Sequence, residues 1–292
     1  MSAVRIDGAA RAAALVERCA RRVSVLAARG VHPTLAVVVV GGDPASQVYV
    51  RNKERACARA GVGSRRFAFP ADARPASVLA CLAGLNADPA IHGILVQLPL
   101  PAQFDVREVI SAIAPEKDVD GFRADNLGAL MTGARGFAPC TPSAVLALLD
   151  DYGIAVAGRH AVIVGRSNIV GKPLAVMLIA RGATVTVCNS RTAPLADFTR
   201  AADVLVVATG RAGLVTGDMV KPGAAVIDVG INRLADGRIV GDADFESVAA
   251  VAGHATPVPG GVGPMTVAFV IANAVAAAER ADSPAAEPAL YI

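Results

Sequence analysis

The segment 41–61, GGDPASQVYVRNKERACARAG, carries a lysine that could act as a proton donor or acceptor. The segment opens with a turn signal and has no further glycine or proline before its last residue, so it predicts a helix. Helical spacing places Ser46, Tyr49, Lys53 and Cys57 on one face of that helix. An inward-facing lysine beside a tyrosine is costly to bury and indicates a functional site. A surface helix whose lysine extends its ammonium group into solvent explains the same segment.

A glutamine ends the third of three predicted strands. Strand-like runs between residues 34 and 98 alternate with helical segments, and this alternation indicates a mostly parallel sheet. Ligands usually bind at the carboxyl ends of such strands, so we expect Gln97 and its neighbour Leu98 on the same rim as Lys53. A glutamine that only satisfies amides of the strand-end loop is the alternative explanation.

Two aspartates, Asp118 and Asp120, lie two residues apart just ahead of Gly121. This arrangement suits a tight loop, and Asx-turn hydrogen bonds within the loop would account for both residues. The residue types alone therefore leave open whether either carboxylate binds a ligand.

A glycine-rich turn at 165–171, GRSNIVG, lies between a predicted strand and a predicted helix (172–181). It departs from the dinucleotide-binding pattern G-x-G-x-x-G, because Ser167 replaces the second glycine and the spacing is longer. Its context still matches a Rossmann-type unit, since a second strand follows at 184–188. The helix amino terminus and the amides of the turn, which begins at Gly165, would hold phosphates.

The end of that second strand indicates which dinucleotide binds. NAD-binding folds place an acidic residue there for the ribose hydroxyls, whereas this strand ends in CNSR (188–191). Ser190 can donate to a phosphate, and Arg191 or Arg166 can pair with it, so we predict NADP rather than NAD. The alternative is an unoccupied Rossmann-like domain with surface arginines. Residues after the third and fourth strands are expected to line the nicotinamide side: Thr209, Gly210 and Ile231.

The loop 255–266, ATPVPGGVGPMT, combines three prolines with three glycines. Proline restricts the chain and glycine permits close approach by a flat ligand, so the loop suits a domain junction where a cleft forms. A plain linker is the alternative, but only Thr256 and Thr266 are polar here.

Length and composition favour an α/β protein of two domains. The chain has 292 residues, of which 54% are apolar and 18% charged, enough for large buried sheets. We predict a first α/β domain over 1–139, completed by the C-terminal helix segment 264–292. We predict a second, Rossmann-type NADP-binding domain over 140–263, with a cleft between the two.

Charge and cysteine content bear on possible partners. The net charge is +3 without a basic cluster, so we predict no nucleic-acid partner. The five cysteines form no CxxC pair and the four histidines lie far apart, so we predict free thiols and no metal. Charges interrupt the apolar N-terminal stretch, and no long uncharged apolar run stands out, so we expect a cytoplasmic protein without a membrane partner.

The motifs together resemble those of the bifunctional methylenetetrahydrofolate dehydrogenase/cyclohydrolase family. Five of them occur in the family's order, within residues 5–280: GGDPASQVYVRNK, GILVQLPLP, PEKDVDGF, GRSNIVGKP and TPVPGGVGPMT. The resemblance implies an enzyme that oxidises 5,10-methylenetetrahydrofolate to the 5,10-methenyl form with NADP. It further implies hydrolysis of that form to 10-formyltetrahydrofolate, a role in one-carbon metabolism and purine biosynthesis, and a homodimer.

The resemblance also implies a role for each residue singled out above. Lys53 matches the catalytic lysine, Tyr49 the tyrosine that stacks on folate, and Gln97 the residue that tunes the lysine. Asp120 matches the residue that holds the pterin ring, and Ser46 belongs to the same motif as the lysine. Two further groups match: the folate-contacting loop at Pro259, Gly260 and Gly261, and NADP contacts at Arg166, Ser167 and Ser190.

Two alternatives stay open at this point. One is a monofunctional dehydrogenase of the same family, against which the retention of Tyr49, Lys53 and Gln97 argues. The other is a non-catalytic module that binds NADP or folate, which would be expected to have lost Lys53 or Asp120.

Overall fold

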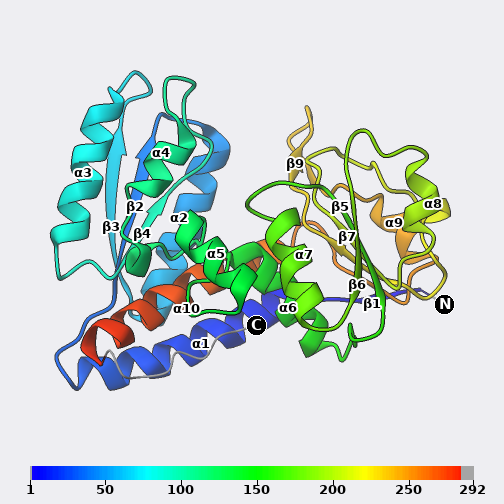
Figure 1. Cartoon of the computed structure of the whole chain (residues 1–292), viewed down its shortest axis with the longest axis horizontal. Helices are drawn as coiled ribbons and strands as arrows, with labels where there is room; N and C mark the ends of the chain where they lie inside the picture. The colour runs from blue at the N-terminus through cyan, green and yellow to red at the C-terminus, as the bar shows by residue number, and fades with distance from the viewer. Residues whose placement is uncertain (1, 284–292) are drawn as a thin grey trace. The chain divides into compact units, whose positions relative to one another are not determined.

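The computed structural model describes residues 2–283, except for the side chains of residues 44–46. The chain divides into two compact units (Figure 1). The three-stranded unit contains residues 13–140 and the helical residues after 266. The six-stranded unit contains residues 1–12 and 141–266.

The sheet of the three-stranded unit is entirely parallel, with β2 in the middle. Six of the seven residues of β2 are buried, as expected for a central strand covered on both faces. Apolar residues of α3 and α4 pack against β2 and β4 in one core cluster. The strands, in spatial order, are β3 (Gly63–Phe69), β2 (Thr34–Val40) and β4 (Gly93–Val96).

Helices α1 and α10 run side by side in this unit (Figure 1), where Arg22 of α1 forms an ion pair with Glu279 of α10. The helices that contribute to the unit are α1 (Gly8–Ala27), α2 (Pro44–Ala60), α3 (Pro75–Ala87), α4 (Val106–Ser111), the 3₁₀ turn η1 (Pro115–Lys117), α5 (Ala124–Thr132) and α10 (Val262–Asp282).

The six-stranded unit has a parallel sheet in the order β1-β11-β8-β7-β5-β6. Its strands are β1 (Val4–Arg5), β5 (His160–Val164), β6 (Thr184–Cys188), β7 (Val204–Val207), β8 (Ala225–Asp228) and β11 (His254–Ala255). A separate antiparallel hairpin joins β9 (Asn232–Arg233) to β10 (Ile239–Val240). The helical elements are α6 (Cys140–Asp151), α7 (Gly171–Ala180), α8 (Leu195–Thr199), the 3₁₀ turn η2 (Gly217–Met219) and α9 (Phe245–Ala249).

The division into units differs from the predicted domains at both chain ends. Residues 1–12, predicted in the first domain, group with the six-stranded unit, because β1 pairs with β11. Two exposed residues carry no alternating pattern, so no strand could be predicted there. The predicted C-terminal segment 264–292 is helical from Val262 to Asp282, and its residues 284–292 lie outside the described part of the chain.

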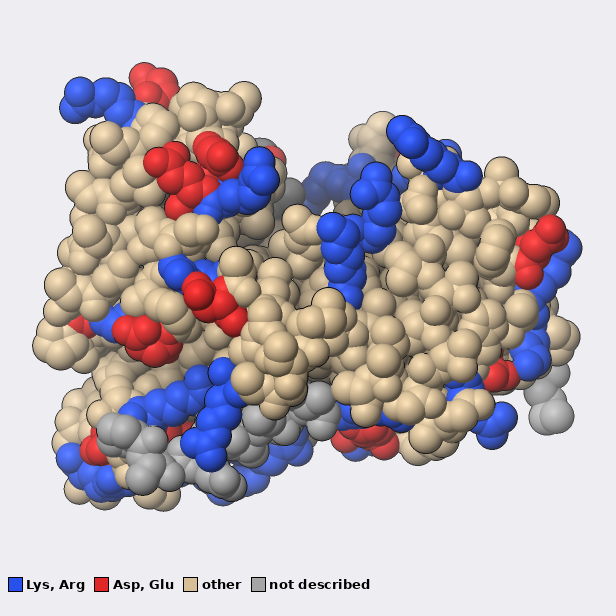
Figure 2. All heavy atoms as spheres, viewed as in Figure 1, with Lys and Arg blue, Asp and Glu red and all other residues tan. Residues whose placement is uncertain are grey.

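Helix α10 is long and apolar enough to span a membrane by length and composition, the one such helix among the residues described. However, 61% of its most apolar stretch is buried, which is typical of a core helix. Acidic and basic residues lie interspersed over the face in Figure 2, and no broad region of one sign is visible there.

Candidate functional site

The helix predicted around Lys53 is confirmed, and its lysine faces inward. Lys53 is only 8% exposed and lies on a helix face with Val50 and Cys57, both fully buried. Arg51 and Arg55 are exposed. The surface-lysine explanation is therefore wrong. The side chain of Ser46, predicted on the same face, lies outside the described residues.

Gln97 provides the hydrogen-bond partner of the buried lysine. Lys53 Nζ donates to Gln97 Oε1 over 3.0 Å, and Gln97 Nε2 donates to the carbonyl of Leu98 over 2.7 Å. Because the Leu98 carbonyl can only accept, this second bond fixes which end of the amide faces the lysine. The predicted proximity of Gln97 and Lys53 is confirmed, and Gln97 also satisfies a loop carbonyl.

The pKa of Lys53 is lowered, foremost because burial penalises the charged ammonium. The acidic groups of Asp120, Cys140 and Cys57 oppose the shift without cancelling it. A lysine in this environment can exist as a neutral amine closer to neutral pH than one in water, and so can serve as a base.

The two aspartates of the KDVDG loop have different environments. Asp118 is 1% exposed, and its carboxylate accepts from the amide of Arg123 and from Asn126 Nδ2, both over 2.8 Å. The backbone of Asp118 also pairs with Ile94 of β4, which brings the loop alongside the strand that Gln97 follows. Burial raises the pKa of the Asp118 carboxyl. Asp118 therefore fixes the loop, although through the Arg123 amide and the Asn126 side chain rather than through an Asx turn.

Asp120 has no hydrogen-bond donor among the described residues. Burial raises the pKa of its carboxyl to about 6; the charge of Lys53 lowers it and that of Asp118 raises it further. Asp120 is only partly exposed. A carboxylate with reduced hydration and no donor is costly, and a ligand with N–H groups would relieve that cost. The structure thus separates a structural aspartate from one available for a ligand.

Two residues that sequence reasoning missed hold the backbone next to Asp120. Asn273 Nδ2 donates to the Val119 carbonyl over 2.8 Å, and the Cys140 thiol lies 3.2 Å from the same oxygen. Burial raises the pKa of Cys140 well above its usual value, so the thiol stays protonated and can donate. The only available signal was an asparagine within an otherwise apolar helical segment.

Tyr49 lies one turn before Lys53 on α2 and is half-buried. Its hydroxyl has no hydrogen-bond partner among the described residues, and burial raises the pKa of the phenol, which keeps it neutral. A neutral ring beside the lysine is suited to stacking against a flat ligand.

In the six-stranded unit, the predicted turn follows β5 directly and leads into α7. A Cβ at Gly165, which has a φ of 130°, would lie 2.1 Å from the Ala208 carbonyl oxygen, and one at Gly171 would lie 2.0 Å from the Gly165 carbonyl oxygen. The first and last glycines of the turn are therefore required by close backbone approach.

Ser167, predicted to contact the cofactor, hydrogen-bonds within the turn itself. Its Oγ accepts from the amide of Val170 over 3.1 Å, so it occupies a helix-start amide expected to be free for phosphate. The amides of residues 166–169 instead have no acceptor among the described residues. These successive free N–H groups, ahead of a ten-residue helix, are suited to bind phosphate oxygens.

The end of β6 carries exposed basic groups and no acid. Ser190, Arg191 and Arg166 are all exposed, and neither arginine forms an ion pair within the described residues. A turn from Asn189 to Thr192, closed by the Thr192 amide and the Asn189 carbonyl over 2.9 Å, sets their backbone. This arrangement suits a phosphate on the ribose.

The residues predicted to line the nicotinamide side lie over the buried carboxylate of Asp242, a residue that sequence reasoning missed. Thr209 and Gly210 follow β7, and both donate backbone N–H bonds to Asp242. Ile231 follows β8 and is 43% exposed. Burial raises the pKa of nearby Asp228 to about 6, against the effect of three backbone N–H donors. Acidic residues in the β9–β10 region carried no recognisable motif.

The loop with Pro259, Gly260 and Gly261 belongs to the six-stranded unit. Gly260 has a φ of 108° and accepts from the amide of Ala9 over 3.0 Å. A Cβ on Gly8 would lie 1.9 Å from the Gly261 carbonyl oxygen, so the loop packs against bare backbone. The structure thus brings Lys53, Gln97 and Asp120 together in one unit, and it places this loop with the predicted cofactor residues in the other.

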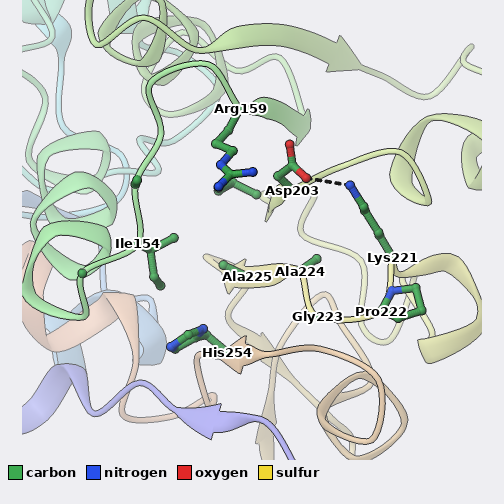
Figure 3. Close-up of a pocket in the computed structure, with 12 residues that line it drawn as sticks. Ile154, Arg159, Asp203, Lys221, Pro222, Gly223, Ala224, Ala225 and His254 are labelled. Carbon is green, nitrogen blue, oxygen red and sulfur yellow. Dashed lines mark hydrogen bonds and ion pairs between the residues drawn. The ribbon is translucent and has the colours of Figure 1, made fainter.

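A hollow of about 360 Å³ lies at the amino-terminal ends of the strands of the six-stranded sheet, away from the phosphate turn (Figure 3). Its lining includes the first residues of β7, β8 and β11, whereas the phosphate turn follows the carboxyl end of β5. Lys221 Nζ and Asp203 Oδ1 pair across 2.7 Å, and Asp203 Oδ2 accepts from the His160 amide. The carboxylate is thus already satisfied, and we assign no ligand to this hollow.

Two family models match the chain. The catalytic domain of tetrahydrofolate dehydrogenase/cyclohydrolase matches residues 6–120, and the NAD(P)-binding domain of the same proteins matches residues 139–282. The bifunctional protein FolD of Bordetella avium is 59% identical over 284 residues, which cover 97% of this chain and 100% of that protein.

Solved structures agree with the family models. The bifunctional FolD of Campylobacter jejuni is 45% identical, with a TM-score of 0.94 over 96% of this chain and 99% of that one. The Trypanosoma brucei methylenetetrahydrofolate dehydrogenase-cyclohydrolase, solved with NADP and an inhibitor, is 40% identical, with a TM-score of 0.94 over 97% of this chain and 99% of that one. This chain belongs to the tetrahydrofolate dehydrogenase/cyclohydrolase family.

Proposed function

We propose that Lys53, Gln97 and Asp120 carry out the folate chemistry of this enzyme. The chain oxidises 5,10-methylenetetrahydrofolate to the 5,10-methenyl form with NADP and hydrolyses that form to 10-formyltetrahydrofolate. The observation that supports the residue assignment is a buried lysine, bonded to Gln97, beside an aspartate that has no donor in the described part of the chain. The pterin ring offers an amino group and a ring N–H, which a carboxylate accepts in a two-point contact.

The oxidation requires positioning more than proton transfer. The methylene carbon loses a hydride with its electron pair, and the positive charge that remains is shared by the two flanking nitrogens. Bound NADP supplies the hydride acceptor. A neutral Lys53 amine does not repel the developing cation, whereas a permanently charged ammonium would. Asp120 would hold the pterin and Tyr49 would stack on it, which fixes the carbon in place.

The hydrolysis requires a base and then an acid. Water adds to the methenyl carbon, and neutral Lys53 accepts the proton that the water loses. The resulting ammonium then donates a proton to the departing ring nitrogen as its bond to the carbon breaks, which regenerates the amine. The hydroxyl left on that carbon loses its proton to solvent as it becomes the formyl carbonyl, so one proton is released overall. Gln97 Oε1 accepts a hydrogen bond from either form of the lysine, so it keeps Nζ in place through both steps.

The six-stranded unit fits NADP. The free amides of residues 166–169 would bind the pyrophosphate at the start of α7, where Gly165 allows close approach. Ser190, with Arg166 and Arg191, would bind the 2′-phosphate. Thr209, Gly210 and Ile231 would lie against the nicotinamide.

We further propose a cytoplasmic homodimer whose product supplies formyl groups for purine biosynthesis. The edge strand β6 and helix α7 leave Val187 38% and Ile179 60% exposed, which would suit contact with a second copy. Light scattering is expected to give twice the 29.5 kDa chain mass, and a charged residue at Val187 should lower it. A monomer at micromolar concentration would contradict the proposed homodimer. Recovery of the protein with membranes on cell fractionation would contradict the proposed cytoplasmic location.

Replacement of Lys53 should impair the hydrolysis without affecting NADP binding. Lys53→Met removes the group that exchanges protons, so the hydrolysis rate should fall by about a hundredfold or more, while NADP affinity stays unchanged. The decay of methenyltetrahydrofolate absorbance measures the rate. Arg55→Met, an exposed change on the same helix, is the control and should behave as wild type. Near-normal hydrolysis by Lys53→Met would rule out the assigned role.

Folate affinity should depend on pH through Asp120. Its carboxyl has a pKa of about 6, so below that value it increasingly holds a proton and accepts less well from the pterin donors. The affinity for a non-reacting folate can be measured by fluorescence between pH 5 and 8, about one to two units around that pKa. The affinity should fall as the pH falls through 6. In Asp120→Asn the binding should be weak and independent of pH in this range. A wild-type slope that persists in the variant would assign the titration to another group.

The cofactor preference should depend on the basic groups at the end of β6. Arg166→Gln and Ser190→Ala each remove a partner of the 2′-phosphate, so each should raise the KM for NADP by about tenfold and leave that for NAD nearly unchanged. Initial dehydrogenase rates with both dinucleotides measure this. Arg238→Gln, exposed in the β9–β10 hairpin, is the control. Equal effects on both dinucleotides, or a wild-type preference for NAD, would refute the assignment.

A further inference from the structure

Asp242 is a fully buried carboxylate that joins two loops of the six-stranded unit. Its side chain is 0% exposed. Oδ2 accepts from the amides of Thr209 and Gly210 over 2.5 and 2.9 Å and from Thr209 Oγ1 over 3.0 Å. Oδ1 accepts from Asn232 Nδ2 over 2.8 Å. One carboxylate therefore connects the loop after β7 to the segment that contains Ile231.

The donors to Asp242 among residues 2–283 are all neutral, so none of the residues described there holds it by an ion pair. A buried carboxylate is unfavourable unless its donors are correctly oriented, which means that it tolerates few arrangements of the loops around it. Such a group restricts the conformations of Thr209 and Gly210 more than an apolar contact would.

A second carboxylate fixes the first. Asp228 Oδ1 accepts from the amides of Gly230 and Asp242, over 2.8 and 3.0 Å, and its Oδ2 accepts from the amide of Ala243. A Cβ on Gly230 would lie 2.2 Å from Asp242 Oδ1, so no side chain fits between them. The backbone that carries Asp242 is thus itself held in place.

We propose that Asp242 is a positioning residue for the nicotinamide end of NADP. It is buried beneath the half-exposed Thr209 and the exposed Gly210 and Ile231, so it acts on the cofactor only through them. The proposal rests on the cofactor role given above to those three residues. Loss of the Asp242 carboxylate displaces the nicotinamide and slows hydride transfer. The hydrolysis needs no hydride acceptor, so this loss leaves it intact.

Two variants of the full-length enzyme test this. Asp242→Ala removes all four bonds and should lower kcat/KM of the NADP-dependent oxidation by about tenfold or more. Asp242→Asn keeps one oxygen, which can still accept from Thr209 and Gly210. Its new amide nitrogen can donate to Asn232 if the Asn232 side-chain amide turns so that its oxygen faces position 242. It should therefore recover a large part of the lost activity. The control is Asp236→Ala, which removes an exposed carboxylate from the neighbouring hairpin and should behave as wild type.

Three readouts distinguish positioning from loss of the fold. Hydrolysis of methenyltetrahydrofolate should stay within about twofold of wild type, since its residues lie in the three-stranded unit. Affinity for 2′,5′-ADP, which carries only the adenosine end of the cofactor, should be unchanged. The deuterium isotope effect on oxidation of substrate labelled at the methylene carbon should increase, because hydride transfer becomes more rate-limiting.

The outcomes separate this inference from the function on which it rests. A wild-type enzyme without NADP-dependent oxidation would refute the proposed function itself. Wild-type oxidation that is unaffected in Asp242→Ala would refute only the positioning role. A parallel loss of oxidation, hydrolysis and 2′,5′-ADP binding would also overturn it, since that pattern indicates a general structural defect.

Discussion

The cost of burying the Lys53 ammonium group is the constraint on which the proposed folate site depends. Burial shifts the lysine toward its neutral form, and nearby Asp120 partly restores the charged form. The balance leaves a side chain that can both accept and release a proton. Gln97 maintains the position of Nζ in either state, because its own amide is fixed by the Leu98 carbonyl. The packing of α2 against the sheet is therefore also what sets the chemistry.

Hydrogen-bond satisfaction distinguishes structural groups from groups left for ligands. Asp118 and Asp242 are buried and have their donors, and they fix loops. Asp120 and Tyr49 lack partners in the part of the chain that the structure describes. The amides of residues 166–169 form the corresponding set in the six-stranded unit. A polar group without a protein partner, next to groups that are satisfied, is what a preorganised binding site requires.

Local patterns in the sequence predicted most of the fold and part of the site. Strand and helix alternation identified both parallel sheets, and helical spacing placed Lys53 on the buried face of α2. The carboxyl-end rule then brought Gln97 to the lysine. These inferences succeeded because each depends on residues close in sequence or on a general property of parallel sheets.

The features that were not predicted from the sequence depend instead on residues far apart in the chain, or on an element too short to show a pattern. Asn273 contacts Val119 across 154 positions, and Asp242 contacts Thr209 across 33, distances at which no periodicity operates. β1 is too short to show alternation, so its pairing with β11 was not predictable. Family resemblance supplied the roles of Asp120 and Tyr49, which composition and spacing could not.

The bond from Asn273 to the Val119 carbonyl has a consequence for biosynthesis. The backbone beside Asp120 leaves the ribosome well before the amide that holds it, because Asn273 follows Val119 by 154 positions. A nascent chain can build the β3–β2–β4 sheet and still lack a properly held carboxylate. The folate recognition proposed for Asp120 would therefore mature only after Asn273 has been translated, and chains that stop before Asn273 would fold in part without acquiring it.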